Sequence, residues 1–358
     1  MAAEETLGRW LPVRAQHWLR DSPRFVRLLN GATLAAAAPA LLARRPAHAA
    51  AFLSRRGVAE EAYGPSARHR MEVFPGPELC CRTVLFVHGG AWGLGEKTLY
   101  RLHGRELQRR GYTACVLNYR TYPFVGSEEQ ASDVLLALRW VRYNAQRRPE
   151  LHMDAERVVM LAHSSGAHIT MLGALRALGA ASTDAVAVAQ EVDTPLCQGL
   201  VLLAGVYCPE QHYNFEVGRG VHEMSYMKPA NSVRGVGPGL DDRTRAMMRA
   251  RSPLRILEEL AAGRSEEQRK SLARRLPPVL LVHGALDKTV PPSSSLNMHD
   301  QLERTIAARS RCVLLEDHDH VSLVLDFLLG KPEGEAVMDL LDRFSTDANR
   351  RPRAFSRL

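Results

Sequence analysis

The sequence contains little cysteine and none of the common cofactor-binding motifs. Its six cysteines lie without CxxC spacing, so we expect neither a disulfide framework nor a zinc site, and this usage fits a reducing compartment. Neither a GxxxxGK motif nor a GxGxxG motif occurs, which argues against a nucleotide-phosphate loop of either type. Internal repeats are absent. The 358 residues, 46% of them hydrophobic, can instead form a large core in one big domain or two modest ones.

The net charge of +8 is concentrated at the two ends of the chain. Residues 1–70 carry 11 Arg and 5 acidic residues, and the last ten residues add Arg350, Arg351, Arg353 and Arg357. These arginines lack interleaved aromatic side chains and no nucleic-acid-binding motif accompanies them, so we expect no nucleic-acid partner. We interpret both ends as solvated tails, and attraction to an anionic membrane surface is the alternative.

One uncharged stretch near the N-terminus bears on membrane association. Leu28–Ala43 is mostly apolar, but its ~16 residues fall short of the ~20 that span a bilayer, and it contains Asn30, Gly31 and Pro39. We favour a soluble extension over residues 1–60, with a helix lying in the membrane interface and a true span as the alternatives. We expect the protein in the cytoplasm or at the cytoplasmic face of an internal membrane.

After residue 70, strand-like and helix-like segments alternate. The expected strands are Thr83–Val87, Ala114–Leu117, Val158–Leu161, Leu200–Leu203, Val279–Val282 and Cys312–Leu315. The expected helices are Leu99–Arg110, Glu128–Gln146, Gly166–Leu178, Ser294–Ala308 and Ser322–Leu329. This alternation predicts an α/β domain over residues 61–345, with a mostly parallel central sheet covered by helices on both faces.

One stretch interrupts the alternation. Residues 207–251 show no clean strand pattern and are rich in Gly, His, Tyr and Met. A long excursion inside an α/β domain is commonly a lid or a substrate-binding segment, so we predict a lid-like insertion, and a solvated loop without a role is the alternative. We interpret Glu258–Arg275 as a solvated helix, and residues 346–358 as a basic C-terminal tail.

Ser164 lies in the motif that carries most of the chemical information. The strand-like run Arg157–Leu161 leads into Ala162-His163-Ser164-Ser165-Gly166, and a helix-compatible segment follows. A nucleophile on such a sharp turn exposes its hydroxyl at the C-terminal edge of a sheet, where the next helix aims free N–H groups at it. Ala162 stands where the pattern usually has glycine, a mild departure because the position requires a small residue. An incidental serine in an ordinary turn is the alternative interpretation.

An acid and a base for Ser164 follow in the order Ser, Asp, His. Asp287 comes on the loop after the strand Val279–Val282, where a carboxylate can fix the tautomer of an imidazole. His320 follows the last expected strand and precedes an apolar helix, and for that reason we prefer it to His318 as the base. Three further histidines near these motifs are interpreted as packed, hydrogen-bonded neighbours: His163, His168 and His283.

Paired glycines after the first expected strand indicate an oxyanion-binding loop, His88-Gly89-Gly90-Ala91-Trp92-Gly93, because a glycine backbone can approach an anion closely. A phosphate cradle over Gly89–Gly95 is the less favoured alternative. The expected oxyanion site comprises backbone groups of Gly89, Gly90, Ala91 and Ser165. For the substrate pocket we expect Trp92, Tyr122, Tyr207, Tyr213 and the segment Tyr213–Met227, with core positions as the alternative.

Together these motifs resemble the α/β-hydrolase superfamily, and within it the esterases and lipases with an HGG-W oxyanion motif. More narrowly, the chain resembles isoprenylcysteine methylesterase-like and kynurenine formamidase-like proteins. The likeness rests on Tyr63-Gly64-Pro65 with His69–Val73, His88–Trp92, Asn118-Tyr119-Arg120 with Pro123, His163–His168, and Ala204–Tyr207 with His212-Tyr213 and Arg219–Val221. It covers roughly residues 60–345 and leaves both ends of the chain unexplained.

The resemblance implies a serine hydrolase that forms an acyl-enzyme intermediate and needs neither a metal nor an organic cofactor. Ser164 would be its nucleophile, His320 its base and Asp287 the acid that orients the base. The insertion favours a small-molecule ester with an apolar group, such as an isoprenylcysteine methyl ester. An amide hydrolase of the formamidase type and a non-catalytic binding protein that kept the fold are the alternatives.

Overall fold

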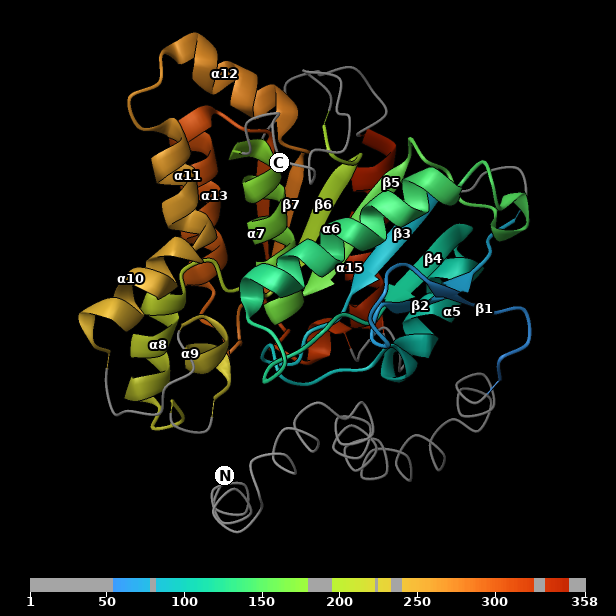
Figure 1. The fold of residues 1–358 in the computed structure, drawn as a ribbon, viewed down its shortest axis with the longest axis horizontal. Helices are drawn as coiled ribbons and strands as arrows, with labels where there is room; N and C mark the ends of the chain where they lie inside the picture. The colour runs from blue at the N-terminus through green and yellow to red at the C-terminus, as the bar shows by residue number, and fades with distance from the viewer. Residues whose placement is uncertain are drawn as a thin grey trace.

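The computed structural model describes residues 54–77, 82–179, 195–222, 225–232, 240–324 and 332–347, with an eight-stranded sheet at their centre (Figure 1). The strands are β1 (Ala59–Ala62), β2 (Arg70–Phe74), β3 (Arg82–Val87), β4 (Tyr112–Leu117), β5 (Val158–His163), β6 (Gly199–Leu203), β7 (Val279–Gly284) and β8 (Ser310–Leu315). Their order is β1-β2-β4-β3-β5-β6-β7-β8, and β2 runs antiparallel to both its neighbours while all pairs from β4 to β8 are parallel. The predicted mostly parallel sheet is confirmed.

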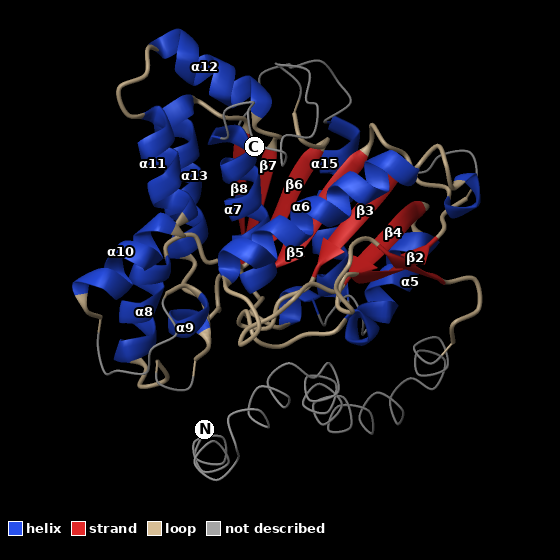
Figure 2. Cartoon of the chain, in the orientation of Figure 1, coloured by secondary structure: helices blue, strands red, loops and turns tan. Residues whose placement is uncertain are grey.

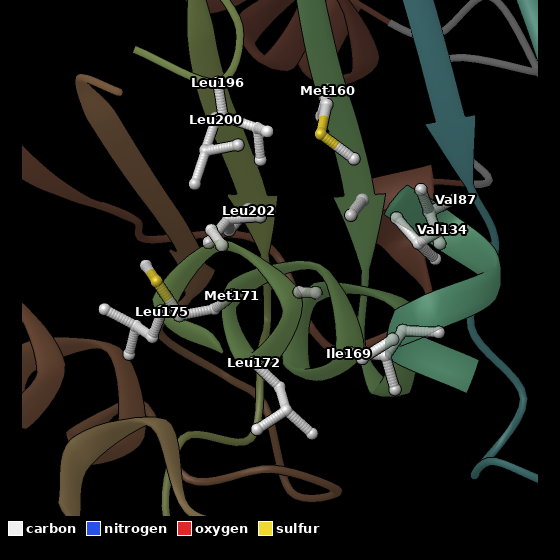
Figure 3. Close-up of a cluster of buried hydrophobic side chains, with 14 of the residues drawn as sticks. Val87, Val134, Met160, Ile169, Met171, Leu172, Leu175, Leu196, Leu200 and Leu202 are labelled. Atoms are coloured by element: carbon white, nitrogen blue, oxygen red, sulfur yellow. The ribbon is translucent and has the colours of Figure 1, made fainter. Parts of the chain in front are cut away.

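Helices cover both faces of this sheet (Figure 2). In β3, Leu85 and Val87 belong to one hydrophobic cluster and Val84 and Phe86 to another, because successive side chains of a strand point to opposite faces. The first cluster includes residues of α6 (Ser127–Asn144), α7 (Ser165–Gly179), α11 (Pro253–Ala261) and α13 (Ser293–Ile306), and part of it is drawn in Figure 3. The second includes residues of α5 (Arg101–Arg109) and α15 (Pro332–Asp347). The short helices η1 (Lys97–Tyr100) and η2 (Pro149–Leu151) precede α5 and β5.

The parallel strands bring their C-terminal ends to one edge of the sheet. Val87 at the end of β3 pairs with Ala162 of β5, and Leu203 at the end of β6 pairs with Val282 of β7. Strand β8 continues the same register beside β7. Loops that follow these strands therefore meet at a common edge, which is where ligands of open α/β sheets bind.

The described parts of the stretch 207–251 contain three helices, α8 (Pro209–Gly218), α9 (Met227–Ala230) and α10 (Asp242–Ala250), and Figure 1 shows these helices grouped beneath α11 and α13. Its two ends are joined, because the Ser252 hydroxyl and the Leu254 N–H both donate to the Tyr207 carbonyl oxygen at 3.0 Å. Between α8 and α10, Glu210 accepts hydrogen bonds from Arg245 (2.7 Å) and Arg249 (3.0 Å). The expected insertion is thus a small helical unit closed at its base.

Some elements differ from what the sequence pattern predicts, and β2 is not among the expected strands. Strand β1 crosses the expected 60/61 boundary and is not predicted, because its four residues alternate between partly buried and exposed and form no apolar run. Helix α15 is not predicted either, and it extends past the expected boundary at 345 to Asp347. The segment Glu258–Arg275 contains the end of α11 and a separate α12 (Glu266–Arg275), since a capping box at Ser265 starts a new helix.

Some expectations fall on residues that the structure does not describe. They are the apolar stretch Leu28–Ala43, the tail beyond Asp347, and the end of the expected helix Ser322–Leu329. Within the described ranges, no helix is both long and apolar enough to cross a membrane. The same ranges contain no group of three or more His, Cys, Asp or Glu side chains arranged to hold a metal ion.

Candidate active site

Ser164 lies on a strained turn between β5 and α7. Its φ of +54° is in the left-handed region, which costs a non-glycine residue on the order of 1–3 kcal/mol and persists only where the surroundings fix it. The Ser164 N–H donates to the Leu203 carbonyl oxygen at 2.8 Å. Next to it, a Cβ on Gly166 would overlap the carbonyl oxygens of Val87 and His88. Helix α7 therefore packs directly on the end of β3 and holds the serine at the edge of the sheet.

Ala162 replaces the usual glycine of this motif. It is fully buried in β5 and pairs regularly with Val87 and Leu202 on the two neighbouring strands. A methyl group is accommodated at this position, and the departure from the motif leaves the turn at Ser164 intact.

The structure brings Ser164, His320 and Asp287 together from the loops after β5, β8 and β7. The His320 Nε2 atom lies 2.9 Å from Ser164 Oγ, and its Nδ1 atom lies 2.7 Å from Asp287 Oδ2. The carboxylate can only accept at neutral pH, so Nδ1 carries the proton and Nε2 is free to accept the serine hydroxyl. The three residues form a continuous hydrogen-bonded relay.

Asp287 is held as a buried carboxylate. Its Oδ1 accepts the backbone N–H groups of Thr289 (2.7 Å) and Val290 (2.9 Å), and its Oδ2 lies 3.2 Å from His283 Nε2. Burial raises the pKa of Asp287, but the hydrogen bonds from His283 and His320 outweigh it and set the pKa well below its usual range. The group therefore stays charged and can stabilise an imidazolium at His320.

His163 supports the base in a way that the sequence does not reveal. Its Nε2–H donates to the backbone carbonyl of His320 at 3.0 Å, and the two rings lie 4.9 Å apart. Burial, with the nearby His320 second, lowers the pKa of His163 to about 3, so the ring is a neutral donor. The competitor His318 is not in the relay; its carbonyl accepts the N–H of Leu286 and so ties its loop to that of the acid.

The loop after β3 lies against the nucleophile. Three consecutive residues have positive φ, Gly90 (138°), Ala91 (48°) and Trp92 (62°). A Cβ on Gly89 would lie only 2.9–3.0 Å from atoms of His163 and Ser164, so a residue without a side chain is needed for the backbone to pass this close to the serine. The N–H groups of this loop, with that of Ser165 at the start of α7, are the candidate donors to an oxyanion.

A buried ion pair anchors the far end of the same loop. The Arg68 guanidinium, which is 6% exposed, donates to Glu96 Oε2, to the Gly95 carbonyl and to the Tyr119 carbonyl, at 3.1, 3.1 and 2.9 Å. Glu96 also accepts from the Asn118 side chain at 2.5 Å. Sequence reasoning missed this support because Arg68 precedes the first predicted strand and belongs to no motif.

Of the expected pocket residues, Trp92 belongs to the oxyanion loop and Tyr122 contacts it. Trp92 is 2% exposed, and its indole N–H donates to His168 Nδ1 at 2.9 Å. The Tyr122 N–H donates to the Trp92 carbonyl at 2.8 Å, and the Tyr122 ring lies 5.8 Å from that of Tyr226. Tyr226 belongs to the expected Tyr213–Met227 segment and packs against Gly93, where a Cβ would overlap its ring. This part of the insertion therefore touches the oxyanion loop.

The other two expected pocket residues, Tyr207 and Tyr213, are also buried. Tyr207 has no exposed surface and packs in the first hydrophobic cluster, which corrects its assignment to the substrate pocket. A side chain enclosed by the core on all sides cannot contact a ligand without rearrangement. Tyr213 is 4% exposed and lies edge-on to His222, with ring centres 5.6 Å apart.

A cavity of about 210 Å³ opens between the insertion and the loop of the acid. Its lining comes from α8, the start of α11 and the segment leading into α13: Cys208, Gln211, His212, Phe215, Leu254, Pro291, Ser293 and Ser294. Pro291 directly follows Val290, whose N–H binds Asp287. None of the aromatic residues named singly for the substrate pocket lines this cavity, whereas Phe215 of the expected segment Tyr213–Met227 does.

The chain has a serine, an acid and a base in this order, on the loops after β5, β7 and β8 of a mostly parallel sheet. This arrangement defines an α/β-hydrolase.

Comparisons with known protein sequences agree with this fold. The family model described as BD-FAE matches residues 76–193. A probable isoprenylcysteine alpha-carbonyl methylesterase of Arabidopsis thaliana is 24% identical over 271 residues, 74% of this chain and 50% of that protein. A probable methylesterase of the same description from Oryza sativa subsp. japonica is 26% identical over 284 residues, 76% and 59% of the two chains. The chain thus spans half to three fifths of the length of these two relatives.

Solved structures show the same fold. Esterase B from Lactobacillus rhamnosis superposes with a TM-score of 0.60 at 19% identity, covering 88% of this chain and 95% of that one. The apo form of esterase 2 from Thermogutta terrifontis gives a TM-score of 0.57 at 19% identity, covering 84% and 98%. The chain therefore has the α/β-hydrolase fold, and it is similar to esterases and methylesterases.

Proposed function

We propose that this protein is a carboxylic ester hydrolase that works through an acyl-enzyme formed on Ser164. The observation that carries the proposal is the relay from Ser164 Oγ to His320 Nε2 at 2.9 Å and from His320 Nδ1 to Asp287 Oδ2 at 2.7 Å. A base within this distance can take the hydroxyl proton as the oxygen attacks. The names of the curated relatives, all methylesterases, support an ester as substrate.

Each step has a residue to perform it. Ser164 Oγ attacks the ester carbonyl while His320 Nε2 takes its proton, and the negative carbonyl oxygen is stabilised by the N–H groups of the oxyanion loop and of Ser165. As the C–O bond breaks, the imidazolium returns the proton to the leaving alcohol. Water then attacks the acyl-enzyme with His320 again as base, which releases the acid and free Ser164. Asp287 stabilises the imidazolium in both halves of the reaction.

For the substrate we propose a small ester with an apolar group, an isoprenylcysteine methyl ester being the leading candidate. The relatives' names support this choice, and the cavity between α8 and the Asp287 loop offers a partly apolar wall of Phe215, Leu254 and Pro291. Burial of an apolar group yields roughly 25 cal/mol per Å², so such a wall favours a hydrocarbon substituent over a polar one.

The test is covalent labelling with a fluorophosphonate, with the modified peptide identified by mass spectrometry and Ser164→Ala as the control. We expect labelling at Ser164 only, and a loss of at least ~10⁴-fold in turnover in the variant with an unchanged melting temperature. A substrate panel of a prenylcysteine methyl ester, p-nitrophenyl acetate and N-formylkynurenine then separates the classes. A strong preference for N-formylkynurenine would replace the ester assignment with a formamidase, and a folded protein without labelling would contradict catalysis by Ser164.

A further inference from the structure

His168 is a buried histidine outside the Ser–His–Asp relay, and both of its ring nitrogens are engaged. It lies on α7 one turn after the nucleophile, and its backbone N–H donates to the Ser164 carbonyl at 3.1 Å. Its Nδ1 accepts the indole N–H of Trp92 at 2.9 Å, and its Nε2 lies 2.9 Å from the Arg251 carbonyl oxygen. Its side chain thus connects a residue of the oxyanion loop to the last residue of the insertion.

The partners of His168 fix which nitrogen carries the proton. A carbonyl oxygen only accepts, so Nε2 must donate to Arg251, and an indole N–H only donates, so Nδ1 must present its lone pair to Trp92. Both bonds therefore require the neutral ring. Burial lowers the pKa of His168 to about 4, which keeps the ring neutral near pH 7.

Trp92 is a residue whose position matters to the oxyanion site. It directly follows Ala91, and both have positive φ, 62° and 48°, a conformation that persists only when neighbouring groups fix it. The Trp92 carbonyl is held by the Tyr122 N–H and by the Gln130 side chain, each at 2.8 Å. The bond from the indole to His168 restrains the other end of the residue, so backbone and side chain are both held.

The other partner, Arg251, is the last residue of the insertion, at the end where the insertion joins the sheet domain. It caps α10 and precedes Ser252, whose hydroxyl closes the insertion onto the Tyr207 carbonyl at 3.0 Å. A second contact from the insertion reaches the oxyanion loop, where the Tyr226 ring packs on Gly93. The oxyanion loop is therefore restrained by the insertion at two separate points.

We propose that His168 is a positioning residue that holds the oxyanion loop through Trp92 and anchors it on the base of the insertion through the Arg251 carbonyl. The proposal rests on the proposed ester hydrolysis. Because oxyanion donors act on charge that develops in the transition state, loosening them lowers kcat more than it raises KM.

The experiment measures kcat and KM for p-nitrophenyl acetate on four variants. Trp92→Phe removes the indole N–H and keeps an aromatic ring, and His168→Leu removes both ring nitrogens. We expect each to lower kcat by ~10- to 100-fold with less than ~3-fold change in KM. The double variant should be no slower than the slower single variant, because both changes break the same bond. His168→Gln offers an amide oxygen that can accept from the Trp92 indole and an amide NH2 group that can donate to the Arg251 carbonyl, and it should recover most of the loss.

Thr113→Val is the matched control. Thr113 is fully buried, and its hydroxyl donates to the His152 carbonyl at 2.6 Å at the opposite end of the sheet. The Thr113→Val variant should have a lower melting temperature and an unchanged kcat. The His168 variants should have a lower kcat at temperatures where all variants are folded. If the wild type is active but kcat is unchanged in Trp92→Phe, the positioning role is overturned and the proposed function stands. The same holds if the two losses multiply in the double variant. A folded wild type without turnover or labelling overturns the proposed function, and this inference falls with it.

Discussion

The catalytic edge of the sheet and the insertion above it are held by different kinds of interaction. Every residue of β5 and of β7 is buried, and the loops that follow them are joined by hydrogen bonds of 2.7–2.9 Å through Asp287 and His320. In the insertion, Glu210 pairs with Arg245 and Arg249, whose side chains are 42% and 55% exposed, and ion pairs of that kind contribute little. Ser164 and Asp287 thus lie on loops that fully buried strands support, whereas partly exposed ion pairs join α8 to α10.

Replacing the acid Asp287 should remove most of the activity without changing the structure of the insertion. In Asp287→Asn the amide oxygen can still accept from Thr289 and Val290, but an amide N–H would face His320 Nδ1 and favour the wrong tautomer. We expect kcat for a small ester to fall by roughly 10³- to 10⁴-fold. Steady-state kinetics on Asp319→Asn, a neighbour in the His320 loop, give the control, which should lose less than ~3-fold. A loss below tenfold in Asp287→Asn would contradict the assigned role.

Lowering the pH below about 6.5 should lower the free energy of unfolding. Burial lowers the pKa of His88, His103 and His163 to about 3 and that of His168 to about 4, whereas the unfolded chain binds these protons near pH 6.5. The unfolded state therefore binds more protons between pH 6.5 and about 4, and stability must fall as the pH falls through that window. Each histidine contributes up to ~1.4 kcal/mol per pH unit.

Urea denaturation at about pH 7, 6 and 5 measures this slope. His168→Gln should reduce the proton uptake on unfolding by about one. A free energy of unfolding that stays constant over the window, or an unchanged slope in the variant, would show that the histidines do not remain neutral in the folded protein.

Replacing His163 tests whether its hydrogen bond to the His320 carbonyl fixes the position of the base. His163→Phe preserves the ring and removes the donor, so the His320 carbonyl is left without its bond. We expect kcat to fall by ~10- to 100-fold, since an unsatisfied buried group costs about 1–3 kcal/mol and the base is displaced. His163→Gln keeps an N–H and should retain more activity than the phenylalanine variant. Equal losses in the two variants would mean that ring packing, and not the hydrogen bond, fixes the base.

The smallest expected effect lies on the insertion side. Ser293 is an exposed residue in the wall of the 210 Å³ cavity, and Ser293→Phe would narrow that cavity without disturbing the core. We expect KM for a prenylcysteine methyl ester to rise by about 5- to 10-fold while p-nitrophenyl acetate is little affected, since this is the low end of the ~1–3 kcal/mol that one pocket group contributes to discrimination. Ser293→Ala is the matched control. Equal KM changes for both esters would place the prenyl group elsewhere.

Local pattern was sufficient for the six strands from β3 to β8 and for the members of the relay. The strands around Val84, Val159 and Leu280 read as buried apolar runs because both their faces are covered, and Ser164, Asp287 and His320 each follow such a run. Strand β1 escaped prediction because an edge strand with alternating exposure carries no such run. Tyr207 was misplaced for a related reason: an aromatic residue after a strand has the same sequence signature in a pocket and in the core.

The sequence by itself determined the α/β class, the turn at Ser164 and the order of nucleophile, acid and base, because periodicity and strand-to-loop transitions are local properties of the chain. Only the tertiary structure decided which partners the histidines beside the predicted base bind. His163, His168, His283 and His320 are alike as letters, and their roles follow from the atom that each ring nitrogen meets: a His320 carbonyl, a Trp92 indole, a buried carboxylate or a serine hydroxyl. Those partners lie up to 157 residues away in the chain and become neighbours only when the sheet is assembled.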